Sequence, residues 1–421
     1  MTAEAQAVED LMADLWPMYR SLSGEGTRET LRRIARDIPL TLNEVPSGTR
    51  VLDWVVPDEW NLRRAVLRDP AGRVVADSDL HPLHAVHYSE PVRCRLSLSE
   101  LEPRLHSLPD RPDAIPYRTS YYHRTWGFSL RHETVARLEP GMFEAEIDAT
   151  LAPGSLTYGE LLVPGELPDE VLVSTHVCHP GMANDNLTGI AAATALARHV
   201  LPGTRRLSYR FLFVPATIGA LAWLHQHRND VGRIRHGLVL SGLGDPGPLT
   251  YKRSRRGDAA VDRVMSHLVR GRGSVLDWHP YGYDERQFGS PGFDLPVGRL
   301  SRSVHGTYPE YHTSADDLSF IRTGQVVEAV ETVLELFDVL EAGLVPRSLA
   351  PYGEPRLGSR GLYGTIGGRT GHDSPEMVHL WVMGLADGEH DVTDIAERSG
   401  LPLRSVLEAI RSLKDAGLIA R

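Results

Sequence analysis

The sequence is poor in cysteine, in long apolar runs and in anything resembling a leader segment. Its 421 residues include only two cysteines, too few for a disulfide framework and consistent with a reducing compartment. No apolar run approaches the roughly 20 residues that a membrane-spanning helix needs. The N-terminal residues include Glu4, Glu9 and Asp10 and lack the basic-then-apolar pattern of a secretory signal. We therefore expect a cytoplasmic protein without a membrane span.

The sequence also lacks an excess of positive charge. It has 45 Lys and Arg against 55 Asp and Glu, which gives a net charge of −10. Because nucleic-acid binding needs a basic surface, this balance argues against nucleic acid as a partner. We expect instead a small-molecule or peptide-like substrate. The composition leaves open whether the chain forms a homo-oligomer.

The first 129 residues divide into two segments of different pattern. Apolar residues recur at helical spacing over 5–18 and 28–38, which predicts two helices around a turn within residues 1–40. Residues 41–129 contain short alternating runs separated by Pro, Asp and Gly, which is typical of a small β-rich unit.

Apolar runs and helical patterns alternate over residues 130–345. We expect buried strands at 171–173, 211–214 and 237–240 and helices at 189–200, 218–227 and 324–342. This alternation predicts an α/β domain whose sheet is mostly parallel and covered by helices on both faces.

The remaining residues read as a linker and a small helical module. Residues 346–374 are rich in Pro and Gly, and 375–421 show three short helical segments, the last two joined by a Ser-Gly-Leu-Pro turn. This pattern predicts a winged-helix-like module. Its third helix mixes basic and acidic residues, so we expect it to contact protein rather than DNA.

One ten-residue segment concentrates metal-ligand chemistry. His176, Cys178, His179 and Asp185 follow a predicted buried strand and precede a predicted helix. Imidazoles and a carboxylate are the ligands that zinc takes, and the carboxyl ends of strands form the active edge of an α/β sheet. We expect His176 and Asp185 to bind the metal. The sequence indicates three roles for His179 equally well: a metal ligand, a substrate contact or a turn residue. We expect Cys178 to be a buried thiol near the site.

Two later segments carry further candidates. His312 lies between Tyr311 and Thr313, shortly before Asp316 and Asp317, and can offer a ring nitrogen to the metal. Either aspartate is placed to cap the following helix. A second segment, 283–297, joins a charged cluster to a Pro/Gly turn and an apolar run.

These segments resemble the zinc aminopeptidase superfamily, whose members share a phosphorylase/hydrolase-like α/β fold. The family's ordered motifs are matched by His176-Val177-Cys178, by the Asn-Asp-Asn-Leu-Thr-Gly of 184–189, by the Ala-Thr-Ile-Gly of 216–219, by 283–296 and by the Tyr-His-Thr-Ser-Ala-Asp of 311–316. The chain is most similar to bacterial aminopeptidase-like proteins with an inserted β domain and a C-terminal winged helix. The resemblance implies a catalytic domain made of 1–40 and 130–345, with 41–129 inserted.

The chain departs from this family at its catalytic base. The family has Glu-Glu where this chain has Ala216-Thr217, so the position of the usual general base carries a methyl group. A further family ligand, an Asp, falls near Ser241 or Gly242, with Asp245 a few residues on. The resemblance therefore implies one divalent zinc ion held by His176, Asp185 and His312.

Because the usual base is missing, another residue would have to accept the proton in catalysis. Glu285 or Glu310 could have taken over the catalytic role, since a general base contributes about 10²–10⁴-fold. The candidates for substrate binding are Asp284, Arg286, Tyr311, Tyr122 and His179.

The leading expectation is a metal-dependent amide hydrolase of aminopeptidase type that acts on a small peptide-like or aminoacylated metabolite. The alternatives are a non-catalytic metabolite-binding or regulatory protein on a peptidase fold, and a metal-dependent acyl transferase or cyclase in a biosynthetic pathway. Sequence alone does not exclude that Ala216 is an engineered change.

Overall fold

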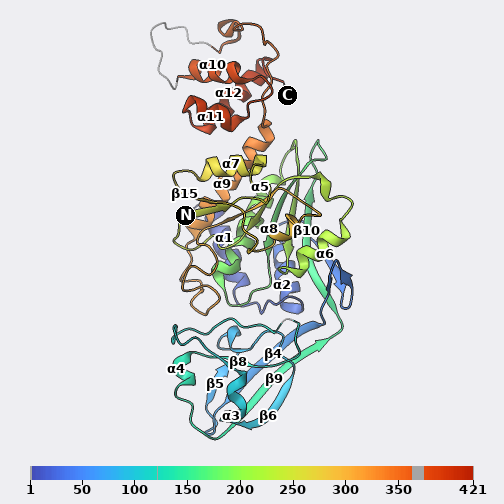
Figure 1. Cartoon of the computed structure of the whole chain (residues 1–421), viewed down its shortest axis with the longest axis vertical. Helices are drawn as coiled ribbons and strands as arrows, with labels where there is room; N and C mark the ends of the chain where they lie inside the picture. The colour runs from blue at the N-terminus through green and yellow to red at the C-terminus, as the bar shows by residue number, and fades with distance from the viewer. Residues whose placement is uncertain (1, 121, 363–373, 421) are drawn as a thin grey trace. The chain divides into compact units, whose positions relative to one another are not determined.

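The computed structural model describes residues 2–120, 122–362 and 374–420 (Figure 1). The chain forms two compact units. The first consists of Met1–Ala259 and Val269–Glu331, and the second of Ala260–Leu268 and Thr332–Arg421. Among the described residues, no helix combines the length and the apolar character needed to cross a bilayer.

The chain begins with the two expected helices, α1 (Ala3–Leu15) and α2 (Glu25–Ile34). The hydroxyl of Thr2 accepts a hydrogen bond from the amide of Ala5 and so caps α1. Val8, Leu11, Met12 and Leu15 recur at helical spacing and are buried, so α1 presents one apolar stripe to the core. Both helices start and end a few residues earlier than the pattern predicts.

An eight-stranded sheet forms the centre of the first unit, in the order β1-β10-β12-β11-β13-β16-β14-β15. Among the described strands, four of its seven pairings are parallel and three are antiparallel. The strands are β1 (Thr41–Pro46), β10 (Ser155–Val163), β11 (Glu170–His176), β12 (Ser208–Val214), β13 (Ile234–Leu240), β14 (Leu249–Lys252), β15 (Gly273–Leu276) and β16 (Val297–Ser301). The predicted α/β class with a mostly parallel sheet is confirmed.

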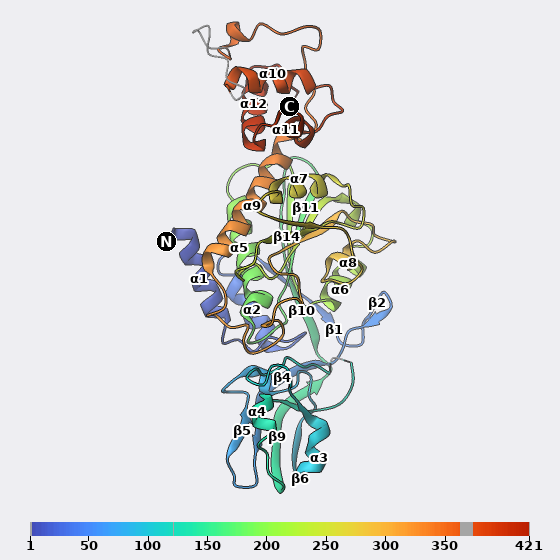
Figure 2. The same cartoon turned by 60° about the vertical axis from the view of Figure 1, so that its left-hand side comes forward.

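Helices cover both faces of this sheet, as Figure 2 shows. On one side lie α1, α2 and α5 (Thr188–Val200), and on the other lie α6 (Ile218–Gln226) and α8 (Glu285–Phe288). All seven residues of β11 are buried, because this strand has a parallel neighbour on each side and helices above and below. β11 therefore ends at His176 inside the unit, which sets the position of the candidate site.

A second sheet of the first unit has the order β5-β4-β9-β6. Its strands are β4 (Glu59–Arg68), β5 (Val74–Asp77), β6 (Val92–Ser97) and β9 (Met142–Ala152). The shorter elements nearby are β2 (Arg50–Val51), β3 (Trp54–Val55), α3 (Leu98–Leu101), β7 (Leu105–His106), β8 (Phe128–Ser129) and α4 (His132–Val135). The predicted limits 41 and 129 do not coincide with this sheet, because β1 joins the large sheet and β9 lies beyond 129. The division into domains stays a prediction in its finer detail.

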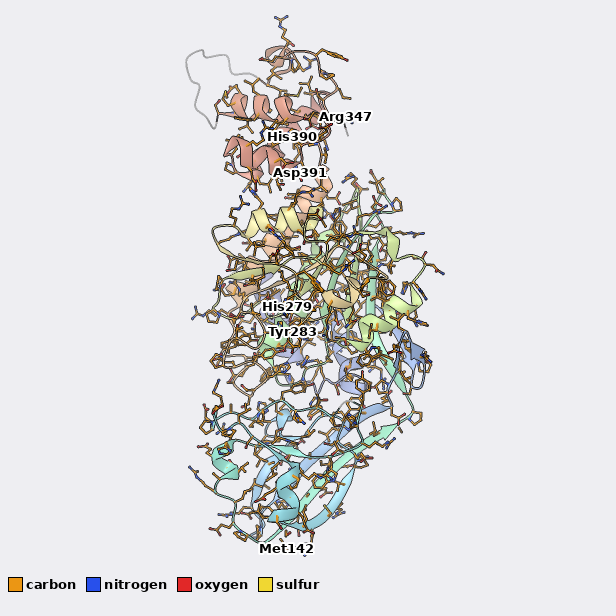
Figure 3. All side chains as sticks on the ribbon, viewed as in Figure 1. Met142, His279, Tyr283, Arg347, His390 and Asp391 are labelled. Carbon is orange, nitrogen blue, oxygen red and sulfur yellow. The ribbon has the colours of Figure 1, made fainter. Side chains whose placement is uncertain are left out.

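The second unit is helical and contains α7 (Ala260–Val269), the later part of α9 (Thr323–Ala342), α10 (Pro375–Leu385), α11 (Val392–Ser399) and α12 (Leu403–Asp415). The carboxylate of Asp391 accepts hydrogen bonds from the amides of Thr393 and Asp394 and caps α11 (Figure 3). Gly400 ends α11 with a left-handed backbone, φ 69°, as glycine readily does. The three helical segments predicted within residues 375–421 are present.

Candidate metal centre

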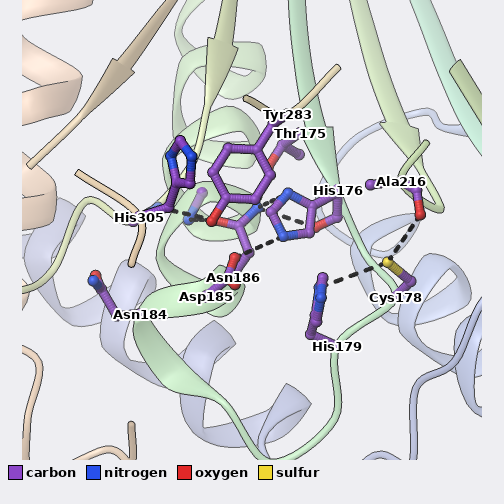
Figure 4. Close-up of polar contacts among 12 residues, drawn as sticks. Thr175, His176, Cys178, His179, Asn184, Asp185, Asn186, Ala216, Tyr283 and His305 are labelled. Atoms are coloured by element: carbon purple, nitrogen blue, oxygen red, sulfur yellow. Dashed lines mark hydrogen bonds and ion pairs between the residues drawn. The ribbon is translucent and has the colours of Figure 1, made fainter. Parts of the chain in front are cut away.

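The carboxylate of Asp185 is the centre of the site. Its Oδ1 lies 2.8 Å from Nε2 of His176, and its Oδ2 lies 2.9 Å from Nε2 of His312. His176 ends β11 and Asp185 lies in the segment before α5 (Figure 4). His312 comes from a loop 127 residues further along the chain. Asp185 is 0% exposed. The structure thus brings together the three residues that the sequence suggests as ligands.

His179 lies close enough to act as a further donor. Ligand atoms of His176, His179 and Asp185 all lie within 4.8 Å of one another, in the described part of the chain. The rings of His176 and His179 meet edge to face, with centroids 4.9 Å apart (Figure 4). Imidazole nitrogens around a buried carboxylate form the donor set that zinc uses in proteins. The residues present therefore fit a zinc ion.

The charges of the cluster suit a cation. Burial alone would raise the pKa of Asp185, but the charges of His179 and His176 and the hydrogen bonds of His176 and His312 hold that pKa well below its usual range. Burial lowers the pKa of His179 well below its usual value, more than Asp185 raises it. Each shift is toward the form that binds metal, an ionised carboxylate for Asp185 and a neutral imidazole for His179.

Asp316 fixes the loop that carries Asp185. Its carboxylate accepts hydrogen bonds from the amides of Asn184 at 2.6 Å and Asp185 at 2.9 Å. The expectation that Asp316 or Asp317 caps the next helix is wrong, because α9 begins only at Thr323. Asp316 is instead buried, and it accepts hydrogen bonds from three main-chain amides of the ligand loop. Its carboxylate accepts two of them, and its carbonyl accepts the third, from Ala183.

Asparagines on both sides of Asp185 hold the same loop. Asn184 accepts hydrogen bonds from the amides of Gly244 and Asp245, and Asn186 donates one to Thr175 at 2.8 Å. These bonds tie the ligand loop to the ends of β11 and β13. Outer contacts of this kind fix ligand orientation in metal sites.

Aromatic rings surround the ligands. Tyr283 stacks on His176 with ring centroids 4.9 Å apart, as Figure 4 shows, and Tyr311 stacks on His312 at 3.9 Å. Tyr117 packs edge-on to His312 at 5.0 Å, and its amide donates a hydrogen bond to the carbonyl of His312.

The predicted contact Tyr122 is 46% exposed and lies against Trp54, with ring centroids 5.4 Å apart. Its neighbour Tyr121 lies outside the described residues. Tyr117, which does contact His312, lies in the same stretch as Tyr122, since residues 117–128 are rich in aromatic side chains. That composition is the signal that could have found it.

At the position of the usual general base, the side chain cannot accept a proton. Ala216 contributes a methyl group, and its carbonyl accepts a hydrogen bond from the thiol of Cys178 at 3.9 Å (Figure 4). Burial raises the pKa of Cys178 to about 12, so the thiol stays neutral. Asp245 is engaged elsewhere, since Asn184 and Ser303 donate hydrogen bonds to it at 3.0 and 2.6 Å.

The neighbouring acids Asp284 and Glu285 differ sharply. Glu285 is 1% exposed and accepts an ion-paired hydrogen bond from Lys252 at 2.9 Å, with Arg299 3.8 Å away. Asp284 is 0% exposed, and neither of its carboxylate oxygens has a hydrogen-bond partner. Burial raises the pKa of Asp284 to about 7, against a lowering influence of His176.

The other candidates lie at the margin of this cluster. Arg286 is half-buried and its Nε has no partner, whereas Glu310 is half-buried and its carbonyl accepts hydrogen bonds from Thr313. The structure tests none of the predicted roles of these residues in substrate binding or catalysis. Lys252 and Arg299, which hold Glu285, lie in the strands β14 and β16, where the sequence carries no sign of a site.

Comparison with known proteins places the chain in a family. The family described as "Domain of unknown function (DUF4910)" matches residues 9–343, and a winged helix-turn-helix family matches residues 344–421. A protein of Clostridium acetobutylicum is 42% identical over 415 residues, which cover 98% of this chain and 95% of the relative. The name of that relative refers to polysaccharide biosynthesis and to an aminopeptidase-like domain.

Solved structures agree with this assignment. The crystal structure of a Clostridium acetobutylicum protein described as a peptidase matches with a TM-score of 0.92 and 39% identity, over 99% of this chain and 96% of that one. A zinc aminopeptidase from Bacillus subtilis matches with a TM-score of 0.56 and 13% identity, over 78% of this chain and 92% of that one.

A peptidase M28 precursor from Shewanella amazonensis matches with a TM-score of 0.57 and 13% identity, over 80% of this chain and 92% of that one. At this identity the last two matches show the fold alone. The resemblance read from the sequence motifs is confirmed. The chain belongs to the DUF4910 family, with an aminopeptidase-like α/β fold followed by a winged helix-turn-helix domain.

Proposed function

We propose that this protein is a metal-dependent amide hydrolase of aminopeptidase type. The observation that carries the proposal is the buried carboxylate of Asp185, whose two oxygens each lie within 3 Å of an imidazole nitrogen. We propose one zinc ion held by His176, Asp185 and His312, with His179 beside it. A divalent ion bound there would act as a Lewis acid on the scissile carbonyl.

The protein's own groups would hold the substrate around this centre. The rings of Tyr283 and Tyr311 cover His176 and His312, so they shield the reacting groups from bulk water. Arg286 is half-buried and its Nε has no partner, so it offers a positive charge that suits a carboxyl group of a small substrate. We therefore propose a peptide-like or aminoacylated molecule as substrate.

The first experiment assays zinc-loaded protein on a panel of aminoacyl anilides. We expect zinc-dependent release of aniline from at least one member, and a fall to the uncatalysed rate in His312→Ala, which loses a ligand. The exposed His279 (Figure 3) provides a matched control, His279→Ala, which should keep full activity. If zinc-loaded protein releases no aniline from any member, the proposal is wrong.

That negative result would favour a non-catalytic protein that binds a metabolite. The observation in favour of this second function is the methyl group of Ala216 at the position of the usual base. The two functions differ in one measurable respect, since a binding protein would retain zinc and ligand yet turn over nothing.

For the winged helix-turn-helix domain we propose a protein contact rather than DNA binding. The exposed cations of α12 are compensated, because Arg404 pairs with Glu408 at 3.1 Å and Arg411 with Asp338 at 3.5 Å. Phosphate binding needs cations that are free to release counterions. We expect no retardation of duplex DNA in a gel-shift experiment at low ionic strength. Salt-sensitive retardation would contradict this assignment.

A further inference from the structure

Among the buried carboxylates around the candidate site, Asp284 stands apart. Asp185 faces two imidazoles, Asp316 accepts main-chain amides, and Asp245 accepts from Asn184 and Ser303. Glu285 is paired with Lys252. In the described structure both oxygens of Asp284 lack any hydrogen-bond partner, and the residue is 0% exposed.

A buried carboxylate without a partner opposes folding. Buried polar groups in native proteins are almost always hydrogen-bonded, and the exceptions gather at functional sites. The next residue differs, since Oε1 of Glu285 has both Lys252 and Arg299 beside it and only its Oε2 lacks a hydrogen-bond partner. The isolation of Asp284 therefore points to a partner that binds during function.

Asp284 also follows a residue that contacts a proposed metal ligand. It follows Tyr283, which stacks on His176, so its main chain is fixed beside a proposed ligand. Against the effect of burial, His176 lowers the pKa of Asp284, and, in addition to burial, Asp284 in turn raises the pKa of the Cys178 thiol. That thiol donates its hydrogen bond to the carbonyl of Ala216. Asp284 thus acts electrostatically on a thiol that contacts the position of the usual base.

We propose that Asp284 is the general base of this enzyme and replaces the carboxylate that Ala216 lacks. This inference rests on the proposed amide hydrolysis. As the oxygen of a water molecule bonds to the scissile carbonyl carbon, a water proton moves to a carboxylate oxygen of Asp284. When the carbon–nitrogen bond breaks, that proton moves to the leaving nitrogen. The products are a carboxylic acid and an amine, and Asp284 regains its starting form.

The test compares Asp284→Asn with wild type. We expect kcat to fall by about 10²–10⁴-fold, the range for loss of a general base, with KM changed only a few-fold. The variant should bind as much zinc as wild type and bind a non-cleavable amide analogue with the same Kd. These two readouts separate a base from a metal ligand, whose loss would lower the zinc content.

A second variant tests whether the lost group is a proton acceptor. In the Asp284→Asn background, Ala216→Glu puts a carboxylate back at the usual position, and we expect it to restore kcat at least about tenfold within that lost range. Three results would each overturn the inference. They are loss of zinc from Asp284→Asn, a kcat equal to wild type in Asp284→Asn, and failure of Ala216→Glu to restore kcat.

The outcomes also distinguish this inference from the proposed function. Zinc-loaded wild type without activity on every anilide rejects both. Active wild type with an equally active Asp284→Asn variant rejects Asp284 as the base and leaves the hydrolase intact.

Discussion

Substituting Asp185 with asparagine is expected to abolish zinc binding and, with it, amide cleavage. The asparagine side chain keeps the size of aspartate but carries no charge, and its nitrogen cannot bind a metal as a carboxylate oxygen does. Asp185 lies within 3 Å of both His176 and His312, so the substitution removes the negative charge between the two imidazoles. Changes in the outer contacts of metal ligands already cost about 10–100-fold in affinity, and loss of a ligand should cost more.

The measurement is zinc affinity by calorimetric titration, with aniline release as the second readout. Asp317→Asn is the matched control, because Asp317 lies beside the same motif but accepts its hydrogen bonds from Ser319 and Phe320. The control should bind zinc like wild type. An Asp185→Asn protein with unchanged zinc affinity would show that the metal, if any, binds elsewhere.

Substituting Glu285 with glutamine is expected to destabilise the first unit by about 3–5 kcal/mol, the usual cost of removing one partner of a buried ion pair. Lys252 and Arg299 are 3% and 1% exposed, and Glu285 is the carboxylate that faces both. Burial already lowers the pKa of Lys252, against the raising influence of Glu285. Without that carboxylate, two buried cations face each other.

The free energy of unfolding of the first unit, measured by urea titration, checks this prediction. Asp284→Asn is the sharpest control, since it makes the same chemical change one residue earlier. That variant removes a charge without a partner, so it should leave the zinc-free protein as stable as wild type or more stable. Equal destabilisation by both variants would contradict this account of the two acids. If Glu285→Gln instead keeps full stability but loses kcat, the catalytic role suggested by sequence is the better reading.

Much of the fold is predictable because its signals are local. The apolar runs 171–173, 211–214 and 237–240 predict strands, and they lie within β11, β12 and β13. Each run is short and is buried on both faces of the sheet. The limits of the second sheet were not predictable in the same way. β9 alternates buried and exposed residues like any half-covered strand, and only pairing with β4 and β6 decides to which sheet it belongs.

The candidate site is predictable where its residues are close in sequence or match an ordered motif. His176 and Asp185 lie nine residues apart, and His312 sits in a motif whose order in the chain suffices to find it. The partners of Asp284 and Glu285 were not predictable, because Lys252 and Arg299 approach only when β14 and β16 pair. Whether an acid is paired or isolated is a property of the tertiary structure, and the sequence pattern treats the two neighbours alike.

Anomalous diffraction at the zinc edge from zinc-soaked crystals tests the central claim most directly. The account predicts one anomalous peak in contact with His176, Asp185 and His312, and its absence from crystals of Asp185→Asn. No peak at these residues in the wild-type crystals would contradict the metal centre, and a second peak of equal height beside it would contradict a single-ion site.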